Sequence, residues 1–189
     1  MGLYSHIQEA WKSEELNHLW RERLITWRKE PVTLRIQYPT RLDRAKSLGF
    51  RAKQGVFIVR QRVMKGAHRR PDWSGGRMSS NMRATKELRK TFKLIAEERA
   101  GKKFSNCEVL NSYFVARDGK YEWYEVILAD RSSTQVLSDK RLSWISEPSN
   151  RGRVFRGLTS AGRRMRGLRW KGKGSEKARP SRRAHKRLL

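Results

Sequence analysis

The sequence predicts an α+β protein: a small antiparallel sheet covered by helices, an N-terminal helical pair and a long irregular basic C-terminal extension. Two apolar runs in residues 107–130 flank Asp118-Gly119, a dipeptide typical of a two-residue type I′ hairpin turn. Apolar residues recur at helical spacing in residues 3–29 and 79–100. Beyond Pro148 glycine recurs every five residues, a period of neither helix nor strand.

Residues 3–12 and 14–29 are predicted to form two helices. The second is expected to start after Ser13, because a serine followed by two glutamates is typical of a helix start, and to end before Pro31. Their apolar stripes carry Trp11, Trp20 and Trp27. These tryptophans could stack on nucleic-acid bases, or pack the helices against each other or a partner protein. Residues 1–33 hold five basic and five acidic side chains, and this zero net charge favours packing.

Residues 34–38 are predicted to be extended, residues 40–49 to form a short helix and residues 55–66 to form a strand. On this strand Arg60 and Arg62 share one face, and the opposite face carries Phe57, Val59 and Val63. Like charges on one sheet face repel unless an anion lies across them. The two arginines are therefore expected to face either a phosphate or, on an edge strand, the solvent.

Residues 66–79 are predicted to form a basic loop with one aromatic residue, Trp73. Stacking of an aromatic side chain on a base contributes about 1–3 kcal/mol. The Trp73 indole could therefore stack on a nucleic-acid base or wedge against it, or it could fold back on its own domain.

The next helix is predicted to start with a cap at Ser79 or Ser80 and to end at Gly101. It is expected to cover one face of the hairpin sheet with a stripe of Leu88, Phe92, Ile95 and Ala96. Acids in the last turn of a helix oppose its dipole, so basic partners are expected for Glu97 and Glu98.

If Asp118 and Gly119 form the hairpin turn, Arg117 faces Lys120 and the register follows. One face should pair Phe114 with Trp123 and Leu110 with Ile127; the other should pair Tyr113 with Tyr124 and Val109 with Leu128. Both faces are apolar, whereas a sheet exposed on one side is polar there. Both faces are therefore expected to be covered.

Residues 132–143 are expected to form a polar connection, with a short apolar anchor at residues 143–145. Beyond Pro148 apolar residues are too sparse to predict a core, so this segment is expected to be disordered alone and to order against a polyanion. We divide the chain into an N-terminal helical segment, an α+β RNA-binding core domain and a Gly/Arg-rich extended tail, at residues 1–33, 34–148 and 149–189. Truncation after Pro148 is expected to leave the core folded.

Positive charge is concentrated outside the hairpin. The 45 lysines and arginines exceed the 18 acids, for a net charge of +27. Residues 107–150 hold five basic and seven acidic side chains, whereas residues 151–189 hold fifteen and one. This distribution predicts nucleic-acid binding through phosphate contacts, whose affinity falls steeply with salt. An extended glycine-arginine tail suits a folded RNA better than a smooth duplex.

Little in the sequence indicates catalysis or metal binding. Cys107, the single cysteine, is predicted to be a buried inert thiol, and the four histidines lack ligand spacing. No Ser/His/acid set, Walker loop or dinucleotide-binding turn is present, and no apolar run approaches the roughly 20 residues of a membrane span. We therefore predict a cytoplasmic protein with no catalytic activity, metal, other cofactor, membrane association or small-molecule substrate.

Six motifs follow one another along nearly the whole chain: Pro39-Thr40-Arg41, Ala52-Lys53-Gln54-Gly55, Ala96-Glu97-Glu98-Arg99-Ala100, Val109-Leu110-Asn111-Ser112-Tyr113, Glu125-Val126-Ile127-Leu128 and Arg156-Gly157-Leu158-Thr159-Ser160-Ala161-Gly162-Arg163. Together they resemble the archaeal and eukaryotic large-subunit ribosomal protein family numbered fifteen with the e suffix. Residues 172–181 look more like the archaeal members.

The resemblance implies a β-α-β-β antiparallel sheet, extensions that thread into large-subunit ribosomal RNA, and a structural role. It implies RNA contacts at the Lys53-Gln54-Gly55 turn and in residues 156–163, which include Arg156 and Arg163. Neighbouring ribosomal proteins are expected to meet the N-terminal helices. The other candidate RNA-binding residues are Arg41, Arg44, Lys46, Arg51, Arg60, Arg62, Lys65, Arg69, Arg70, Trp73, Arg77, Lys86, Arg89, Lys90, Arg151, Arg164, Arg166, Arg169, Lys171, Lys173, Arg179, Arg182 and Arg183.

Two other classes of function are alternatives. A nucleic-acid-modifying enzyme would need a pocket with an acid of perturbed pKa, for which Glu125 and Asp130 are the candidates. A non-ribosomal basic nucleic-acid-binding protein, such as an RNA chaperone or a DNA-compacting protein, would need only the basic tail. The ribosomal hypothesis predicts instead that the protein sediments with the large subunit at moderate salt.

Overall fold

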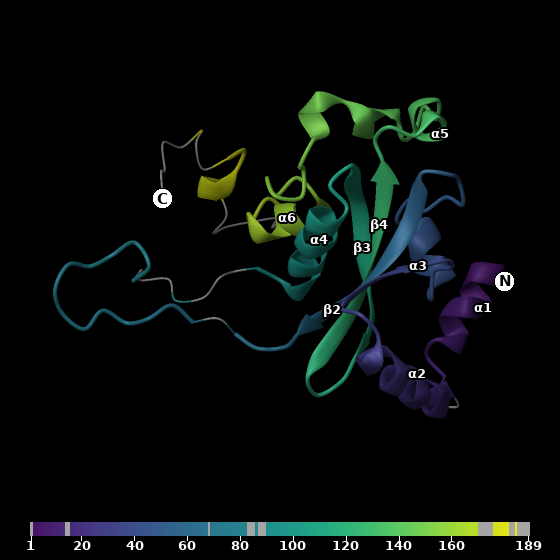
Figure 1. The fold of residues 1–189 in the computed structure, drawn as a ribbon, viewed down its shortest axis with the longest axis horizontal. Helices are drawn as coiled ribbons and strands as arrows, with labels where there is room; N and C mark the ends of the chain where they lie inside the picture. The colour runs from purple at the N-terminus through teal and green to yellow at the C-terminus, as the bar shows by residue number, and fades with distance from the viewer. Residues whose placement is uncertain are drawn as a thin grey trace.

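The computed structural model describes residues 2–13, 16–67, 69–82, 86, 90–169, 176–181 and 184. Four strands, β1 (Thr33–Ile36), β2 (Val56–Met64), β3 (Cys107–Arg117) and β4 (Tyr121–Asp130), form an antiparallel sheet in the order β1-β2-β4-β3. The helices are α1 (Leu3–Ala10), α2 (Asn17–Lys29), α3 (Leu42–Ser47), α4 (Phe92–Lys103), α5 (Thr134–Leu137) and α6 (Ser160–Met165), with 3-10 helices η2 (Ser143–Ser146), η3 (Pro148–Asn150) and η4 (Glu176–Ala178) (Figure 1). This arrangement confirms the predicted α+β class.

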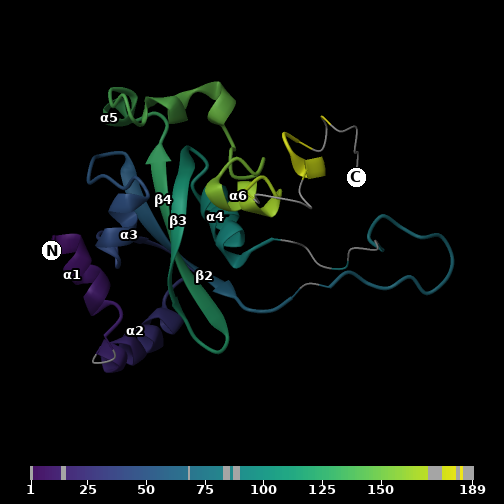
Figure 2. The ribbon, with the colours of Figure 1, turned by 180° about the vertical axis from the view of Figure 1, so that it is seen from behind.

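Helices lie on both faces of the sheet, as expected from its two apolar faces. Helices α1, α2 and α3 lie on one side of the strands, and α4 and α6 lie on the other (Figures 1 and 2). The first core includes Trp27, Ala45, Ile58, Trp123, Ile127 and Ile145. The second core includes Val59, Val63, Leu94, Val126, Leu128 and Ala161. Ile145 is fully buried, which confirms the apolar anchor at residues 143–145.

The tryptophans of the two N-terminal helices pack against one another and against the sheet. Ring centroids are 4.7 Å apart for Trp11 and Trp20, and 6.0 Å apart for Trp20 and Trp27. Trp27 then lies 6.0 Å from Trp123 of β4. The packing interpretation is therefore confirmed.

The strand and short helix predicted for residues 34–66 are present as β1, α3 and β2. Val59 and Val63 lie in the second core, and Val56 and Ile58 lie in the first, as the predicted alternation requires. However, β2 pairs with both β1 and β4, so Arg60 and Arg62 do not lie on an edge strand. That alternative is wrong.

The hairpin turn lies one residue later than predicted. The Asp118 N–H donates to the Tyr121 carbonyl (2.9 Å), and Asp118 Oδ1 accepts from the N–H groups of Lys120 (2.7 Å) and Tyr121 (2.5 Å). Gly119 and Lys120 are thus the central residues, and Gly119 does not adopt the positive φ of a type I′ turn. The Asp118 side chain supplies the turn hydrogen bonds instead.

Two β-bulges then change the register of the hairpin. The observed pairs include Arg117 with Glu122, Phe114 with Tyr124, Tyr113 with Glu125, Asn111 with Ile127, and Val109 with Leu128. Only the last of the predicted pairs is therefore confirmed; the predicted partners of Arg117, Phe114, Tyr113 and Leu110 are wrong. Because each bulge inserts one residue, Tyr113 and Phe114 also exchange faces: Tyr113 lies in the first core, and Phe114 contacts the Tyr124 ring at 5.8 Å.

Helix α4 starts and ends later than predicted. Thr91 is its N-cap, with Oγ1 accepting from the Leu94 N–H (3.3 Å), so the helix does not start near Ser79. It continues through Gly101 to Lys103, so Gly101 does not end the helix. Gly101 instead permits close packing, since a Cβ at this position would lie 3.1 Å from Val154 Cγ1. The predicted cover of the sheet by this helix is confirmed, whereas Leu88 of the predicted stripe lies outside the described residues.

Residues beyond Pro148 add to the second core, contrary to the expectation that they are too sparse to do so. Val154 and Ala161 are 2% and 4% exposed. A Cβ on Gly162 would lie 2.5 Å from the Gly157 Cα, so backbone contact between two glycines replaces the side-chain packing that apolar patterning detects. The division of the chain at residues 33 and 148 stays a prediction.

Across the described parts of the chain, every helix is too short or too polar to cross a lipid bilayer. The longest, α2, has 13 residues.

Candidate nucleic-acid interface

Residues 69–82, between β2 and α4, extend away from the sheet as a basic loop (Figures 1 and 2). Trp73 is 54% exposed in this loop, and its indole N–H donates to the Gly76 carbonyl (3.0 Å). Lys86 pairs with Asp72 (2.8 Å) and donates to the Pro71 carbonyl (3.0 Å); its hydrogen bond to Asp72 lowers the pKa of that carboxyl. Trp73 therefore does not pack on its own domain, and its stacking on a base stays a prediction.

Arginines gather around α6 and the first turn of α4. Burial lowers the pKa of Lys93, and the nearby Glu97 raises it. The positive charges of Arg44, Arg169 and Arg164 lower it further. The structure thus brings together basic side chains from α3, α4 and the residues around α6, and an anion placed among them would relieve their repulsion.

A buried carboxylate holds α6 against the sheet. Glu97 Oε1 accepts from the Ser112 hydroxyl (2.5 Å), and Oε2 accepts from the Thr159 hydroxyl (2.6 Å). Burial raises the pKa of Glu97, and the two hydroxyl donors oppose that rise. Glu97 thus hydrogen-bonds to two hydroxyl groups, and the positive charges of the expected basic neighbours, here Lys93 and Arg153, lower its pKa. Glu98 accepts from Lys90 at 2.9 Å, as expected.

Glu125 has the same role on the opposite face. It accepts from the Thr40 N–H (3.1 Å), the Thr40 hydroxyl and the Tyr113 hydroxyl. Burial raises the pKa of Glu125, and burial together with the Glu125 charge raises the pKa of Tyr113. Because Glu125 is fully buried and anchors chain segments, and Asp130 accepts from the Ser132 N–H (2.9 Å), both candidate acids are structural.

The other carboxylates of residues 107–150 are also bonded within the protein. Their donors are Gly152 N for Glu108 (2.7 Å), Arg28 Nε for Asp118 (2.8 Å), Tyr124 OH for Glu122 (2.6 Å), Lys53 Nζ for Asp139 (2.6 Å) and Ser149 Oγ for Glu147 (3.1 Å). The exposed surface is therefore dominated by basic side chains, whose field favours a polyanion.

The predicted RNA contacts that are bonded inside the protein include Arg60 to Glu30 (2.5 Å), Arg62 to the Arg28 carbonyl, Arg41 to Asp43 (3.2 Å) and Lys65 to the Asp118 carbonyl (2.9 Å). The three arginines also lie over the rings of Trp27, Tyr121 and Trp11, at 4.2, 4.8 and 4.7 Å from the ring centroids. Arg60 and Arg62, which share one face of the sheet, therefore have hydrogen-bond and ring partners within the protein and need no anion between them.

The remaining predicted contacts differ in exposure and pairing. Exposed side chains with a partner in the protein are Lys53, Gln54, Arg69, Lys90 and Arg156, the last of which donates to the carbonyls of Ser149 (2.5 Å) and Arg151 (2.8 Å). Side chains that are at least partly exposed and form no ion pair among the described residues are Arg44, Lys46, Arg51, Arg70, Arg77, Arg151, Arg163, Arg164, Arg166 and Arg169. Arg179 is half-buried, and Arg89, Lys171, Lys173, Arg182 and Arg183 lie outside the described residues.

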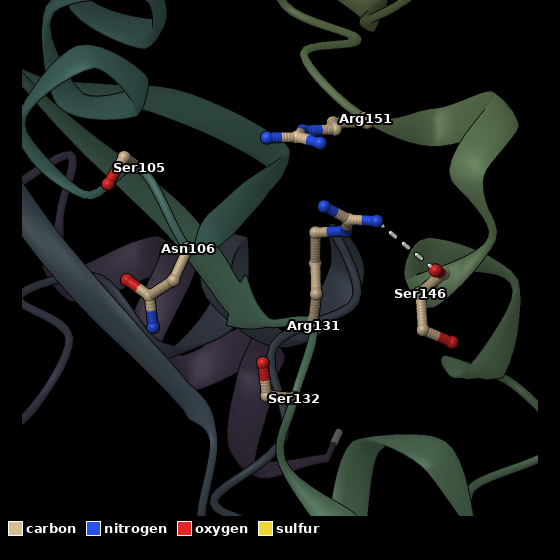
Figure 3. Close-up of a pocket in the computed structure, with 6 residues that line it drawn as sticks. All are labelled: Ser105, Asn106, Arg131, Ser132, Ser146 and Arg151. Carbon is tan, nitrogen blue, oxygen red and sulfur yellow. Dashed lines mark hydrogen bonds between the residues drawn. The ribbon is translucent and has the colours of Figure 1, made fainter.

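Sequence reasoning missed a polar pocket at the base of the hairpin (Figure 3). Its volume is about 430 Å³, and it is lined by Ser105, Asn106, Arg131, Ser132, Ser146 and Arg151. No pattern distinguishes Arg131 from other basic residues, because the pocket forms only when three distant segments meet. Arg153 was also missed; it donates to the Val109 carbonyl (2.6 Å) and lies over the Trp144 ring, so it is structural.

Cys107 is buried, and this burial raises the pKa of its thiol to about 11, in agreement with the predicted inert thiol. Among the described residues, no three His, Cys, Asp or Glu side chains come together in a way that could hold a metal ion.

The sequence matches the family model described as Ribosomal L15 over residues 2–185. It is 52% identical over 192 residues to large ribosomal subunit protein eL15 of Picrophilus torridus, covering 100% of this chain and 98% of that protein. The eL15 proteins of Thermoplasma volcanium and Methanocella arvoryzae are each 50% identical, over 99% and 97% of this chain and 97% and 96% of their own lengths. The resemblance inferred from the six motifs is confirmed, and the chain belongs to the Ribosomal L15 family.

Proposed function

We propose that the exposed basic side chains of α3, of the loop before α4 and of residues 151–169 bind phosphates of large-subunit ribosomal RNA. As a family member, the protein is a structural component of the large ribosomal subunit in the cytoplasm, not an enzyme, and it associates with ribosomal RNA and ribosomal proteins. The observation that supports the interface is the division of charge: the carboxylates of residues 107–150 are bonded internally, whereas the arginines around α6 form no ion pair among the described residues.

The basic group around Lys93 is the centre of this interface. Arg44, Arg164 and Arg169 come from segments far apart in the sequence and all act on the Lys93 pKa. Arginine can bind phosphate through two parallel hydrogen bonds, so each can neutralise a phosphate where RNA strands crowd. The Lys53-Gln54-Gly55 turn and residues Arg156–Arg163 would extend the contact.

A salt titration of binding to large-subunit ribosomal RNA tests this interface. The triple variant Arg44→Gln/Arg164→Gln/Arg169→Gln is compared with Lys12→Gln/Arg21→Gln/Lys29→Gln, which removes equal charge from exposed positions of the N-terminal segment. We expect the slope of log affinity against log salt to fall by roughly 0.7–0.9 for each lost phosphate contact in the first variant only. Equal slopes for the two variants would contradict the proposed interface.

We propose that the N-terminal helices contact neighbouring ribosomal proteins. Leu3, Tyr4, Leu19 and Ile25 are 66%, 45%, 41% and 52% exposed, and the net charge of residues 1–33 is zero. A neutral surface with exposed apolar side chains fits a protein better than RNA. In assembled large subunits a photo-cross-linker at Tyr4 should therefore capture protein, and one at Arg163 should capture RNA; RNA capture from Tyr4 would contradict the assignment.

A non-ribosomal RNA chaperone or DNA-compacting protein is not favoured. Such a protein would need only the basic tail, whereas the family match covers residues 2–185.

A further inference from the structure

The pocket at the base of the hairpin brings together arginines from two separate segments. Arg131 directly follows β4, and Arg151 directly follows η3. The residues Ser105 and Asn106, between α4 and β3, complete the opposite wall. Figure 3 shows both guanidinium groups extending into the space between the start of β3 and residues 143–151.

The hydrogen-bonding capacity of these arginines is incompletely used. Arg131 Nε is buried without a hydrogen-bond partner, and Nη2 reaches the Ser146 carbonyl only at 3.4 Å. Within the described residues neither arginine forms an ion pair, and the pocket lining includes no carboxylate. Two guanidinium groups beside one cavity repel each other. An anion held between them relieves that repulsion, whereas the buried Arg131 Nε lies out of its reach.

We propose that this pocket binds one unpaired nucleotide of RNA, with its phosphate held by Arg131 and Arg151. This inference rests on the proposed RNA-binding function and identifies a subsite within it. The volume of about 430 Å³ lies in the range of pockets that hold small organic ligands, roughly 300–1,000 Å³, and is larger than a phosphate group alone needs. Space therefore remains for the sugar and base attached to that phosphate.

The other lining groups suit a nucleoside. The hydroxyls of Ser105 and Ser132 can donate to or accept from ribose hydroxyls, and the Asn106 amide can pair with the edge of a base. Proteins recognise specific RNA nucleotides mainly where bases are unstacked, since the edges of a base in a duplex are engaged or hidden. A single-stranded or bulged segment is therefore the expected occupant, and a duplex is not.

The test uses the full chain with three probes: a fluorescent ten-nucleotide polyuridine, an RNA duplex of equal length, and inorganic phosphate as a competitor. The variants are Arg131→Gln and Arg151→Gln. The control Arg117→Gln removes the same charge from an exposed side chain at the other end of the hairpin. We expect each pocket variant to weaken polyuridine binding about tenfold, as for loss of a charge-assisted hydrogen bond, and Arg117→Gln to change it less than twofold. Duplex binding should change less than threefold in all variants.

Because Arg131 contacts the Ser146 carbonyl, Arg131→Gln could also destabilise the fold. The Arg151 side chain has no hydrogen bond or ion pair described within the protein, so Arg151→Gln tests the pocket if Arg131→Gln unfolds. Equal polyuridine affinities of Arg151→Gln and Arg117→Gln would overturn the pocket while large-subunit RNA binding, and so the proposed function, stands. Equal losses of duplex and polyuridine binding, or displacement of polyuridine by millimolar phosphate alone, would overturn the nucleotide assignment. Failure of the unmodified protein to bind large-subunit RNA would instead overturn the proposed function.

Discussion

The substitution Thr159→Val tests whether residues beyond Pro148 belong to the folded core. The Thr159 side chain is fully buried. Its hydroxyl donates to Glu97 Oε2 (2.6 Å) and accepts from the Gly162 N–H (3.1 Å), which caps α6. Valine has nearly the same shape as threonine, so the change removes both hydrogen bonds with little change in packing.

The expected loss follows from these two contacts. Removing one partner of a buried hydrogen bond costs about 1–3 kcal/mol, and loss of an N-cap costs about 1 kcal/mol. The free energy of unfolding should therefore fall by about 2–4 kcal/mol, a large part of the 5–15 kcal/mol typical of a domain. Thr159→Ser keeps the hydroxyl and removes one methyl group, so it should cost only about 1 kcal/mol.

Urea denaturation followed by tryptophan fluorescence at fixed salt measures these differences. Thr134→Val, at an exposed threonine, is the matched control and should change the free energy of unfolding by less than about 0.5 kcal/mol. If Thr159→Val and Thr159→Ser were equally stable with the same urea dependence, the Thr159 hydroxyl would contribute nothing. The segment after Pro148 would then not be held by Glu97, and the earlier expectation that truncation there leaves the core folded would regain support.

Three further predictions concern packing, pH and the basic loop. Gly162→Ala should destabilise the protein by about 1–3 kcal/mol in the same urea assay, because its Cβ would meet the Gly157 backbone at 2.5 Å, whereas Gly119→Ala, with no heavy atom within 4 Å, should be near neutral. Burial raises the pKa of Glu97 in the folded protein. Between the pKa of Glu97 in the unfolded chain and its higher pKa in the folded protein, the folded state binds more protons, so the free energy of unfolding falls as pH rises. Glu97→Gln should flatten this part of the profile of unfolding free energy against pH, and an unchanged profile would contradict the assignment. Trp73→Ala should leave the melting temperature within about 1 °C of that of the unmodified protein, because the exposed indole hydrogen-bonds only within its own loop among the described contacts. The same change should weaken RNA binding by about 1–3 kcal/mol. A melting temperature several degrees lower would show that the indole packs on the domain.

Elements whose side chains alternate or recur regularly could be predicted from the sequence. On β2 the two faces separate as expected, with Ile58 in one core and Val59 in the other. Trp20 and Trp27 lie seven residues apart in α2, as helical spacing requires, and together with Trp11 after α1 their rings form a continuous packed series. In both cases burial of apolar surface decides the structure, and apolar periodicity reports it directly.

The register of the hairpin could not be predicted in the same way. It depends on the Asp118 side chain, which bonds two N–H groups of the turn, and on bulges near Leu110 and Val115. A bulge adds one unpaired residue, and no residue type marks its position strongly enough to be recognised. A shift of one residue exchanges the faces of Tyr113 and Phe114, so a small error in the turn becomes a large error in the core.

Contacts between distant segments explain the other errors. Gly101 matches the usual glycine at a helix end, but its position within α4 reflects close contact with Val154, far along the chain. Charge likewise identifies Arg60 and Arg164 as equal candidates for RNA binding. Only the structure shows that Arg60 pairs with Glu30, whereas the Arg164 side chain is exposed.

The two buried glutamates explain how a chain of net charge +27 holds its basic segments in place without neutralising them. Glu97 and Glu125 lie on opposite faces, and each accepts from a threonine that directly precedes a basic segment: Thr159 before α6, and Thr40 before Arg41 and α3. Neighbouring residues of edge strand β3, Ser112 and Tyr113, supply the second donor on each face. All these donors are uncharged hydroxyl or amide groups, and among the described residues neither carboxylate forms an ion pair with an arginine or lysine. The arginines that follow, Arg44 and Arg164, are exposed and form no ion pair among the described residues, so their charge is available to an external anion.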